Sequence, residues 1–205
     1  MTSAERLAAL ARSSGEIISA SDAQAHGISR VQLSRMVERG QLCKAGRGLY
    51  FRPEAELSAL QDLAFVGKRV PKAVVCLISA LRFHEITSQQ PYEVWVAVAA
   101  GIRSPNIDYP PTRVVHFSAE SFDEGAERHT IDGVEVRVYS VEKTVVDCFK
   151  FRNKIGLDVA LEALHDAWQQ RRCDLGKLRQ YAALCRMTNV MQPYLESLLH
   201  SAAQN

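Results

Sequence analysis

Apolar residues between Ser29 and Gly40 recur with the period of an α-helix. At about 100° per residue, Leu33, Met36 and Val37 share one face, and the polar and charged residues between them point away. A helix on the surface of a folded domain has this division into an apolar and a polar face. The pattern therefore predicts an amphipathic helix that begins after Ser29 and ends before Gly40.

A shorter helix is predicted immediately before it. Residues 22–26 follow Ser21, whose hydroxyl suits an N-cap, and Gly27 ends the segment because glycine adopts positive φ at little cost. Ser29 and Gln32 then form a capping-box pattern, in which the two side chains satisfy backbone N–H groups reciprocally. Two helices joined by a short turn that contains glycine predict a helix-turn-helix unit.

A β-hairpin is predicted after the second helix. Residues 41–44 and 49–52 form two short strand-like runs with a glycine-containing turn between them. Gly46 and Gly48 permit positive φ in that turn and hold Arg47 at its tip. The hairpin therefore has the position of the wing in a winged helix-turn-helix.

Two weaker elements are predicted upstream. Apolar positions at helical spacing from Ser3 to Arg12 predict a first helix, which Gly15 ends. Residues 16–18 predict a short extended segment. The whole order of elements up to Pro53 predicts a winged helix-turn-helix domain over residues 1–53.

The remaining chain, residues 54–205, has the pattern of a second and larger domain. Strands are expected at 93–99, 113–117 and 134–139, and helices at about 57–66, 72–83, 141–152, 157–171, 175–186 and 189–200. The helix at 72–83 is almost wholly apolar and is expected to be buried, and Ser140 is expected to cap the helix that follows it. Strands followed by helices, without strict alternation, predict an α+β class with a small sheet and C-terminal helices.

Composition narrows the class of protein. The chain has 205 residues, 47% of them hydrophobic, which is sufficient for a packed core. Its five cysteines are odd in number and include no C-x-x-C pair, so neither a disulfide framework nor a zinc site is indicated. We find no signal-peptide pattern and no apolar run of bilayer length, and we therefore expect a cytoplasmic protein with no membrane partner.

Charge is distributed unevenly along the chain. Up to Arg52 there are eight basic and four acidic residues, a net charge of +4. The remainder has 17 basic and 19 acidic residues, a net charge of −2. A basic N-terminal segment on a mildly acidic body is typical of a nucleic-acid-binding module joined to another kind of domain, although ordinary surface scatter would also produce this excess.

The outward face of the second helix carries the candidate chemistry. The candidate DNA-binding residues are Arg30, Val31, Gln32, Arg35, Arg39, Lys44 and Arg47. Arginine and glutamine side chains form hydrogen bonds with guanine and adenine edges in the major groove, and valine suits a thymine methyl group. Arg30, near the helix start, suits a phosphate, and the two wing cations suit the DNA backbone or minor groove. The alternative is an ordinary amphipathic surface helix followed by an ordinary hairpin.

Several stretches also resemble a known family. They are GEIISASDAQAHGISRVQLSRMVERGQLCKAGRGLYFRP near the N-terminus, and then VVCLISALRFHEIT, PYEVWVAV and VYSVEKTVVDCFKFRNKIGLDVALEAL. The first resembles the N-terminal winged helix-turn-helix of the abortive-infection AbiEi antitoxins, and the others resemble blocks of their C-terminal region. The resemblance implies a transcriptional regulator that binds repeats in its own promoter. It also implies an antitoxin of a type IV pair, which counteracts a nucleotidyltransferase-like toxin with or without direct contact.

Catalysis is the competing hypothesis for the body. Lys143 and Asp147 are four residues apart on one predicted helix, at the spacing of an ion pair. The expected structure is a solvated ion pair or a carboxylate bound to neighbouring backbone. His84, Glu85 and His116 offer an acid and a base in principle, but the sequence contains no phosphate-binding loop, nucleophile elbow or H-E-x-x-H motif. We therefore expect no enzymatic activity, no cofactor and no metal.

Two alternatives to the DNA-binding antitoxin remain open. One is an interaction protein that binds a partner and no DNA, with Trp168 and Tyr181 as the anchors to test, because aromatic residues contribute disproportionately at interfaces. The other is a catalytic antitoxin that modifies its toxin, which would require a nucleotide site.

Overall fold

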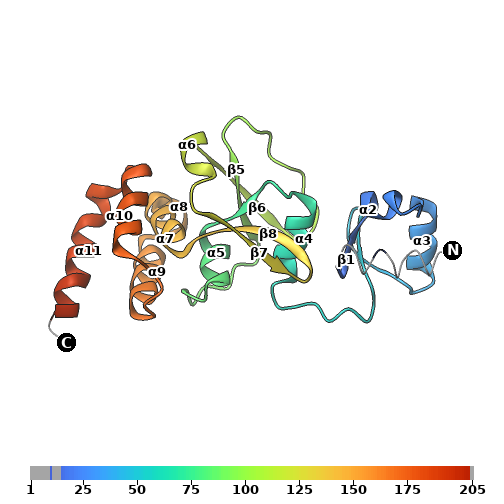
Figure 1. Cartoon of the computed structure of the whole chain (residues 1–205), viewed down its shortest axis with the longest axis horizontal. Helices are drawn as coiled ribbons and strands as arrows, with labels where there is room; N and C mark the ends of the chain where they lie inside the picture. The colour runs from blue at the N-terminus through green and yellow to red at the C-terminus, as the bar shows by residue number, and fades with distance from the viewer. Residues whose placement is uncertain (1–9, 11–14, 204–205) are drawn as a thin grey trace. The chain divides into compact units, whose positions relative to one another are not determined.

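A computed structural model describes residue 10 and residues 15–203 of the chain (Figure 1). Apart from Leu10, the predicted first helix at Ser3–Arg12 lies outside the described residues. The chain forms two compact units. The first comprises residues up to 73 together with 104–113 and 128–137, and the second comprises 74–103, 114–127 and the residues from 138 onward. The predicted domain boundary after residue 53 stays a prediction.

The first unit contains a three-stranded antiparallel sheet with the order β1-β3-β2. Its strands and the two helices beside them are β1 (Ile17–Ser19), α2 (Ala20–Ala25), α3 (Arg30–Glu38), β2 (Cys43–Gly46) and β3 (Leu49–Phe51). Apolar residues of these elements and of the segments beside them form a small core that includes Leu10, Ile18, Leu33, Met36 and Leu42. The elements therefore follow one another in the predicted order, with the polar face of α3 outside the core.

The start of α2 differs from the prediction. Ser19, and not Ser21, is the N-cap: its hydroxyl accepts from the Asp22 N–H at 3.1 Å, and the Asp22 carboxylate accepts from the Ser19 N–H at 3.2 Å. With Ser21 as the N-cap, the residue three positions later would be Gln24, an amide, whereas with Ser19 it is Asp22, a carboxylate. A carboxylate is the stronger acceptor, and the helix dipole favours a negative charge in the first turn. The helix therefore begins at Ala20, two residues earlier than predicted, and Ser21 lies inside it.

The capping box of α3 is confirmed. The Ser29 hydroxyl accepts from the Gln32 N–H, and the Gln32 side-chain oxygen accepts from the Ser29 N–H at 2.8 Å. The helix ends at Glu38, with Arg39 as the C-cap and Gly40 at a φ of +69°. Local sequence signals were sufficient to place both ends of this helix.

The hairpin has a tighter turn than predicted. Strand β2 continues to Gly46, which pairs with Leu49, and the register shifts between Lys44 and Gly46. Of the two glycines, Gly48 takes the positive φ, at +73°. Residues 45 and 46, which were expected in the turn, therefore belong to β2, where a bulge shifts the register.

A five-stranded sheet has the order β6-β5-β4-β8-β7. Its strands are β4 (Val74–Val75), β5 (Val94–Ala99), β6 (Thr112–Phe117), β7 (Ala126–Ile131) and β8 (Val134–Tyr139). The three predicted strands are present, and the α+β class is confirmed. Two strands, β4 and β7, were not predicted. Strand β7 alternates weakly, but the Asp132–Gly133 turn after it, with both φ angles positive, is a hairpin signal that would have identified it.

The helices of the body are close to their predicted positions. They are α4 (Gln61–Arg69), α5 (Leu77–Phe83), α6 (Ala119–Phe122), α7 (Val141–Lys150), α8 (Arg152–Ile155), α9 (Leu157–Gln169), α10 (Leu175–Leu184) and α11 (Thr188–Ala203). The helix expected at 72–83 is wrong in its first part, because residues 74–75 pair with β5. The helix expected at 57–66 begins only at Gln61 and runs to Arg69.

Most of the second unit is organised around α7. The Ser140 hydroxyl accepts from the Lys143 N–H, so the predicted N-cap is confirmed. Helices α5, α9 and α10 pack against α7, and every residue from Val141 to Phe149 is buried. None of the helices in the described part of the chain has the length and apolarity that crossing a bilayer requires.

Candidate nucleic-acid interface

The outer face of α3 presents a hydrophobic residue among cations. Val31 is 61% exposed, although valine is a residue that normally lies in a core. Arg35 and Arg39 are also exposed, and Leu33 and Met36 on the opposite face are buried. The helix therefore offers exposed guanidinium groups and one apolar contact on a single side, as the sequence predicted.

The Gln32 side chain forms part of the N-cap of α3 in addition to its predicted contact with a base. Its side-chain oxygen accepts from the Ser29 N–H, so the amide is part of the α3 N-cap. Bidentate recognition of adenine uses both the oxygen and the nitrogen of an amide side chain. The cap and a bidentate base contact therefore compete for the same oxygen, and the role of Gln32 in base reading stays a prediction.

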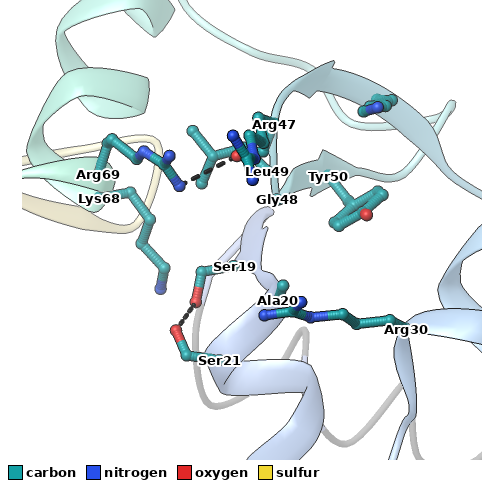
Figure 2. A pocket seen from close by; sticks show the side chains of 11 residues that line it. Ser19, Ala20, Ser21, Arg30, Arg47, Gly48, Leu49, Tyr50, Lys68 and Arg69 are labelled. Atoms are coloured by element: carbon teal, nitrogen blue, oxygen red, sulfur yellow. Dashed lines mark hydrogen bonds between the residues drawn. The ribbon is translucent and has the colours of Figure 1, made fainter. Parts of the chain in front are cut away.

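A polar hollow of about 530 Å³ opens beside α3 within the first unit (Figure 2). We call it the basic hollow; it is lined by Ser19, Ala20, Ser21, Arg30, Lys44, Arg47, Gly48, Leu49, Tyr50, Lys68 and Arg69. Figure 2 shows Arg30 extending toward Ala20 from one side and Lys68 and Arg69 entering from α4 on the other. Five of the lining residues are cationic, and within the described part of the chain no acidic residue lines the hollow.

Three of the predicted DNA contacts meet in the basic hollow. Arg30, Lys44 and Arg47 line it, although they come from the start of α3 and from the hairpin. The other four predicted contacts, Val31, Gln32, Arg35 and Arg39, are not among its lining residues. The structure therefore brings the proposed phosphate contacts together and leaves the proposed base contacts on the outer face of α3.

The tip of the hairpin is fixed by hydrogen bonds to its backbone. The Arg47 N–H donates to Asp108 Oδ2 at 3.0 Å, and Arg69 Nη1 donates to the Arg47 carbonyl at 3.0 Å. The Gly48 carbonyl accepts from the Ala20 N–H at 2.8 Å. Arg47 therefore keeps an exposed side chain on a backbone that is held from two sides.

Lys68 is held by an ion pair at the edge of the hollow. Its Nζ lies 2.8 Å from Asp22 Oδ2, and the two side chains are 17% and 30% exposed. Partial burial acts to raise the pKa of Asp22, but hydrogen bonds from Lys68 and Ser19 outweigh it and lower the pKa overall. The carboxylate that caps α2 thus also positions a cation of α4.

The sequence did not identify Lys68 and Arg69 as candidate site residues. The predicted domain ended at residue 53, and the helix was expected to stop at residue 66, before both cations. The available signal was the basic last turn that follows the apolar residues 63–66. Its importance depended on which elements the end of α4 contacts, and the sequence does not contain that information.

Arg52 is engaged elsewhere, although it contributed to the positive charge counted in the N-terminal segment. Its guanidinium lies 2.9 Å from Glu16 Oε1 and 3.3 Å from Glu54 Oε1. The hydrogen bonds that Arg52 donates to the Glu16 carboxylate raise the pKa of Arg52. Much of its charge is therefore neutralised within the protein.

Lys143 and Asp147 form a buried pair, so the expectation of a solvated pair was wrong. Lys143 Nζ lies 2.5 Å from Asp147 Oδ2, and neither side chain is exposed to solvent. The ammonium also lies 4.3 Å from the ring centroid of Tyr139 and 4.8 Å from that of Phe117. Burial raises the pKa of Asp147, and the charge of Lys143 opposes that shift. In this arrangement neither group reaches a substrate in solvent.

A cysteine completes the surroundings of this pair. The Cys185 thiol donates to Asp147 Oδ1 at a sulfur–oxygen distance of 3.6 Å. Burial, with the nearby carboxylate, raises the pKa of Cys185 to about 11, so the thiol is protonated at neutral pH. The cluster therefore has the properties of a buried polar network in a core, and the thiol is not an activated nucleophile.

The two histidines of the catalytic hypothesis form structural hydrogen bonds. His84 is buried and its Nε2 lies 2.7 Å from the Tyr139 carbonyl oxygen, while Nε2 of His116 lies 3.0 Å from the Ile102 carbonyl oxygen. Across the described residues, no group of three or more His, Cys, Asp and Glu side chains is placed to hold a metal ion.

Comparisons with known proteins address the family and the fold. Among solved structures, the chain is similar to the crystal structure of RV2827C protein from Mycobacterium tuberculosis, with a TM-score of 0.62 and 14% sequence identity. The match covers 89% of this chain and 72% of that one. At this identity the likeness concerns the fold, and it supports the α+β class. A search of curated protein sequences gave no significant match.

The family comparison concerns the N-terminal segment. Residues 5–53 match the family described as "Transcriptional regulator, AbiEi antitoxin". This range contains the predicted helix-turn-helix, the hairpin and all seven candidate DNA-binding residues. The resemblance to AbiEi-type antitoxin transcriptional regulators, predicted from the sequence, is thereby confirmed on residues 5–53.

Proposed function

We propose that this protein is a DNA-binding transcriptional autoregulator and the antitoxin of a type IV, AbiE-like pair. Residues 1–53 form a winged helix-turn-helix that binds repeats in the promoter of its own operon. Residues 54–205 form the domain that counteracts a nucleotidyltransferase-like toxin encoded beside it. The observation that carries the proposal is the family match on residues 5–53, since the same range presents the exposed arginines of α3.

The chemistry of α3 supports a division of labour along the proposed interface. Arg35 and Arg39 suit hydrogen-bond acceptors on base edges, and Val31 suits a thymine methyl group in the major groove. Arg30, Lys44 and Arg47 line the basic hollow and suit phosphates. Such contacts predict binding that weakens steeply with salt and retains a preference for one sequence.

The first experiment tests DNA binding with the full chain. Binding to the promoter upstream of its own gene is compared with binding to scrambled DNA of equal length, at a low and a high salt concentration. A strong preference for the promoter supports the regulator. Equal, salt-sensitive binding to both duplexes contradicts sequence-specific regulation, and the absence of binding favours the interaction protein that binds no DNA.

A second experiment tests the antitoxin role. Expression of the neighbouring gene alone should arrest growth, and co-expression of this protein should restore it. The R35A variant, impaired in DNA binding, should still restore growth when both genes are expressed from an unrelated promoter. Failure of the wild type to protect cells would remove the antitoxin role.

A further inference from the structure

We propose that α4 contributes to the DNA-binding surface, with Lys68 and Arg69 seating a phosphate of the duplex backbone in the basic hollow. This inference rests on the proposed function, since it requires duplex binding. It places phosphate contacts in a helix that lies outside residues 5–53, the segment that matches the regulator family.

The composition of the hollow favours an anion. Cations on α3, the hairpin and α4 face one space of about 530 Å³, and within the described part of the chain none of its lining residues is acidic. At the edge of the hollow, Asp22 pairs with Lys68 and Asp108 accepts from the Arg47 N–H, so two carboxylates lie beside five cations. The cations outnumber these carboxylates, and a bound phosphate reduces the repulsion that remains among them. The Ser19 and Ser21 hydroxyls, 2.7 Å apart, add neutral hydrogen-bonding groups to the same wall.

The two α4 cations are held in place for such a contact. Arg69 uses Nη1 to bind the Arg47 carbonyl, and a guanidinium carries five N–H donors in a planar fork. Lys68 lies 2.8 Å from Asp22, and an ammonium carries three N–H donors. Each side chain is therefore oriented by a protein contact toward the hollow that it lines, and charged N–H donors of this kind form strong hydrogen bonds with phosphate oxygens.

The duplex backbone is the source of phosphate that the surroundings favour. Arg30, Lys44 and Arg47, the residues proposed to contact DNA phosphates, line the same hollow as Lys68 and Arg69. The hairpin tip that carries Arg47 is tied to α4 through the Arg69 hydrogen bond. DNA that reaches the wing therefore meets the end of α4 as well.

The test uses the full chain with the double substitution Lys68→Gln and Arg69→Gln. We expect promoter and scrambled duplexes to weaken by the same factor, about tenfold at low salt, because phosphate contacts are insensitive to sequence. The slope of log K against log salt should fall by about 1 to 2. The matched control, Lys177→Gln with Arg179→Gln on the exposed face of α10, should change neither quantity.

A second variant has the opposite expected sign and guards against misfolding of the first. Asp22→Asn removes a negative charge beside Lys68 and retains an acceptor for the α2 cap. We expect it to strengthen binding to both duplexes by about two- to threefold. Thermal unfolding of each variant confirms that it is folded before binding is compared.

The outcomes separate this inference from the proposed function. If the wild type binds promoter DNA and neither variant changes the affinity or the salt slope, the α4 contact is wrong and the regulator stands. If the wild type binds no duplex, both are wrong. A further arm titrates inorganic phosphate against thermal unfolding. Suppose that inorganic phosphate stabilises the wild type but not the double variant, while both proteins bind DNA with equal affinity. The hollow then binds free phosphate, and the proposal that it binds the duplex backbone is wrong.

Discussion

Lys68 and Lys143 both pair with an aspartate, yet their surroundings give them different roles. Lys68 and Asp22 are 2.8 Å apart and partly exposed, at the edge of a hollow lined by other cations. Lys143 and Asp147 are 2.5 Å apart with no exposure, and the Lys143 ammonium lies beside the rings of Phe117 and Tyr139. Part of the first lysine's side chain is exposed to solvent, whereas the second lysine is enclosed in the core. Two pairs of the same composition therefore differ in exposure because different elements pack around them.

Breaking the buried pair should have the largest effect. Asp147→Ala leaves the Lys143 ammonium buried without its counter-ion, and we expect the free energy of unfolding to fall by about 3 to 5 kcal/mol. Replacing both residues with apolar side chains, as in K143M/D147L, should recover much of that loss. Urea unfolding of the full chain measures each value.

A surface pair provides the matched control for that prediction. Arg128 and Glu135 are 2.9 Å apart with side chains 71% and 61% exposed, so Arg128→Ala should cost at most about 1 kcal/mol. Equal losses for D147A and R128A would show that the Lys143–Asp147 pair is not buried as described.

The space around Lys143 can be tested from Gly125, which has a φ of +73°. A Cβ added there would lie 2.8 Å from Lys143 Cβ and 3.0 Å from the Tyr181 hydroxyl oxygen. Overpacking and the positive φ together should cost about 2 to 4 kcal/mol on Gly125→Ala, again measured in urea. At Gly40, with a φ of +69° but open space around it, alanine should cost less. Equal costs at the two sites would contradict the close approach to Lys143.

Among the exposed residues of the proposed DNA-binding surface, Arg35 should have the largest effect on DNA binding. Arg35→Ala removes a guanidinium from the outer face of α3, and we expect a loss of about 1 to 3 kcal/mol on the promoter with a reduced preference over scrambled DNA. The two duplexes are titrated side by side. A loss of equal size on both would mean that Arg35 contacts phosphate and reads no base.

Arg47 should show the smaller and sequence-independent effect. Arg47→Ala removes one phosphate contact from the hollow, and all duplexes should weaken about equally while the salt slope falls by about 1. The backbone contacts to Asp108 and Arg69 do not involve the removed side chain, so the hairpin should keep its position. A change in sequence preference would place Arg47 against base edges instead.

How much could be predicted differs between the two parts of the proposed DNA surface. The outer face of α3 follows from residues within one or two turns: the apolar spacing of Leu33 and Met36, and the cap formed by Ser29 and Gln32. The basic hollow does not. Arg47 and Arg69 are 22 positions apart, and no local sequence pattern predicts the hydrogen bond between them. The wrong N-cap predicted for α2 has the same origin at shorter range. Ser19 and Ser21 both suit the cap, and the capping box that Ser19 forms with Asp22 makes Ser19 the N-cap.

The sequence by itself determined the α+β class, both ends of α3, the Ser140 cap of α7 and the resemblance of residues 5–53 to a regulator family. Periodicity, caps and turn residues act over a few neighbouring residues, so the chain displays them directly. Tertiary structure alone decided that Lys68 joins the cations of the hairpin and that Lys143 is buried. Both outcomes depend on which distant elements pack against a helix, and the free energy of that packing is a property of the whole fold.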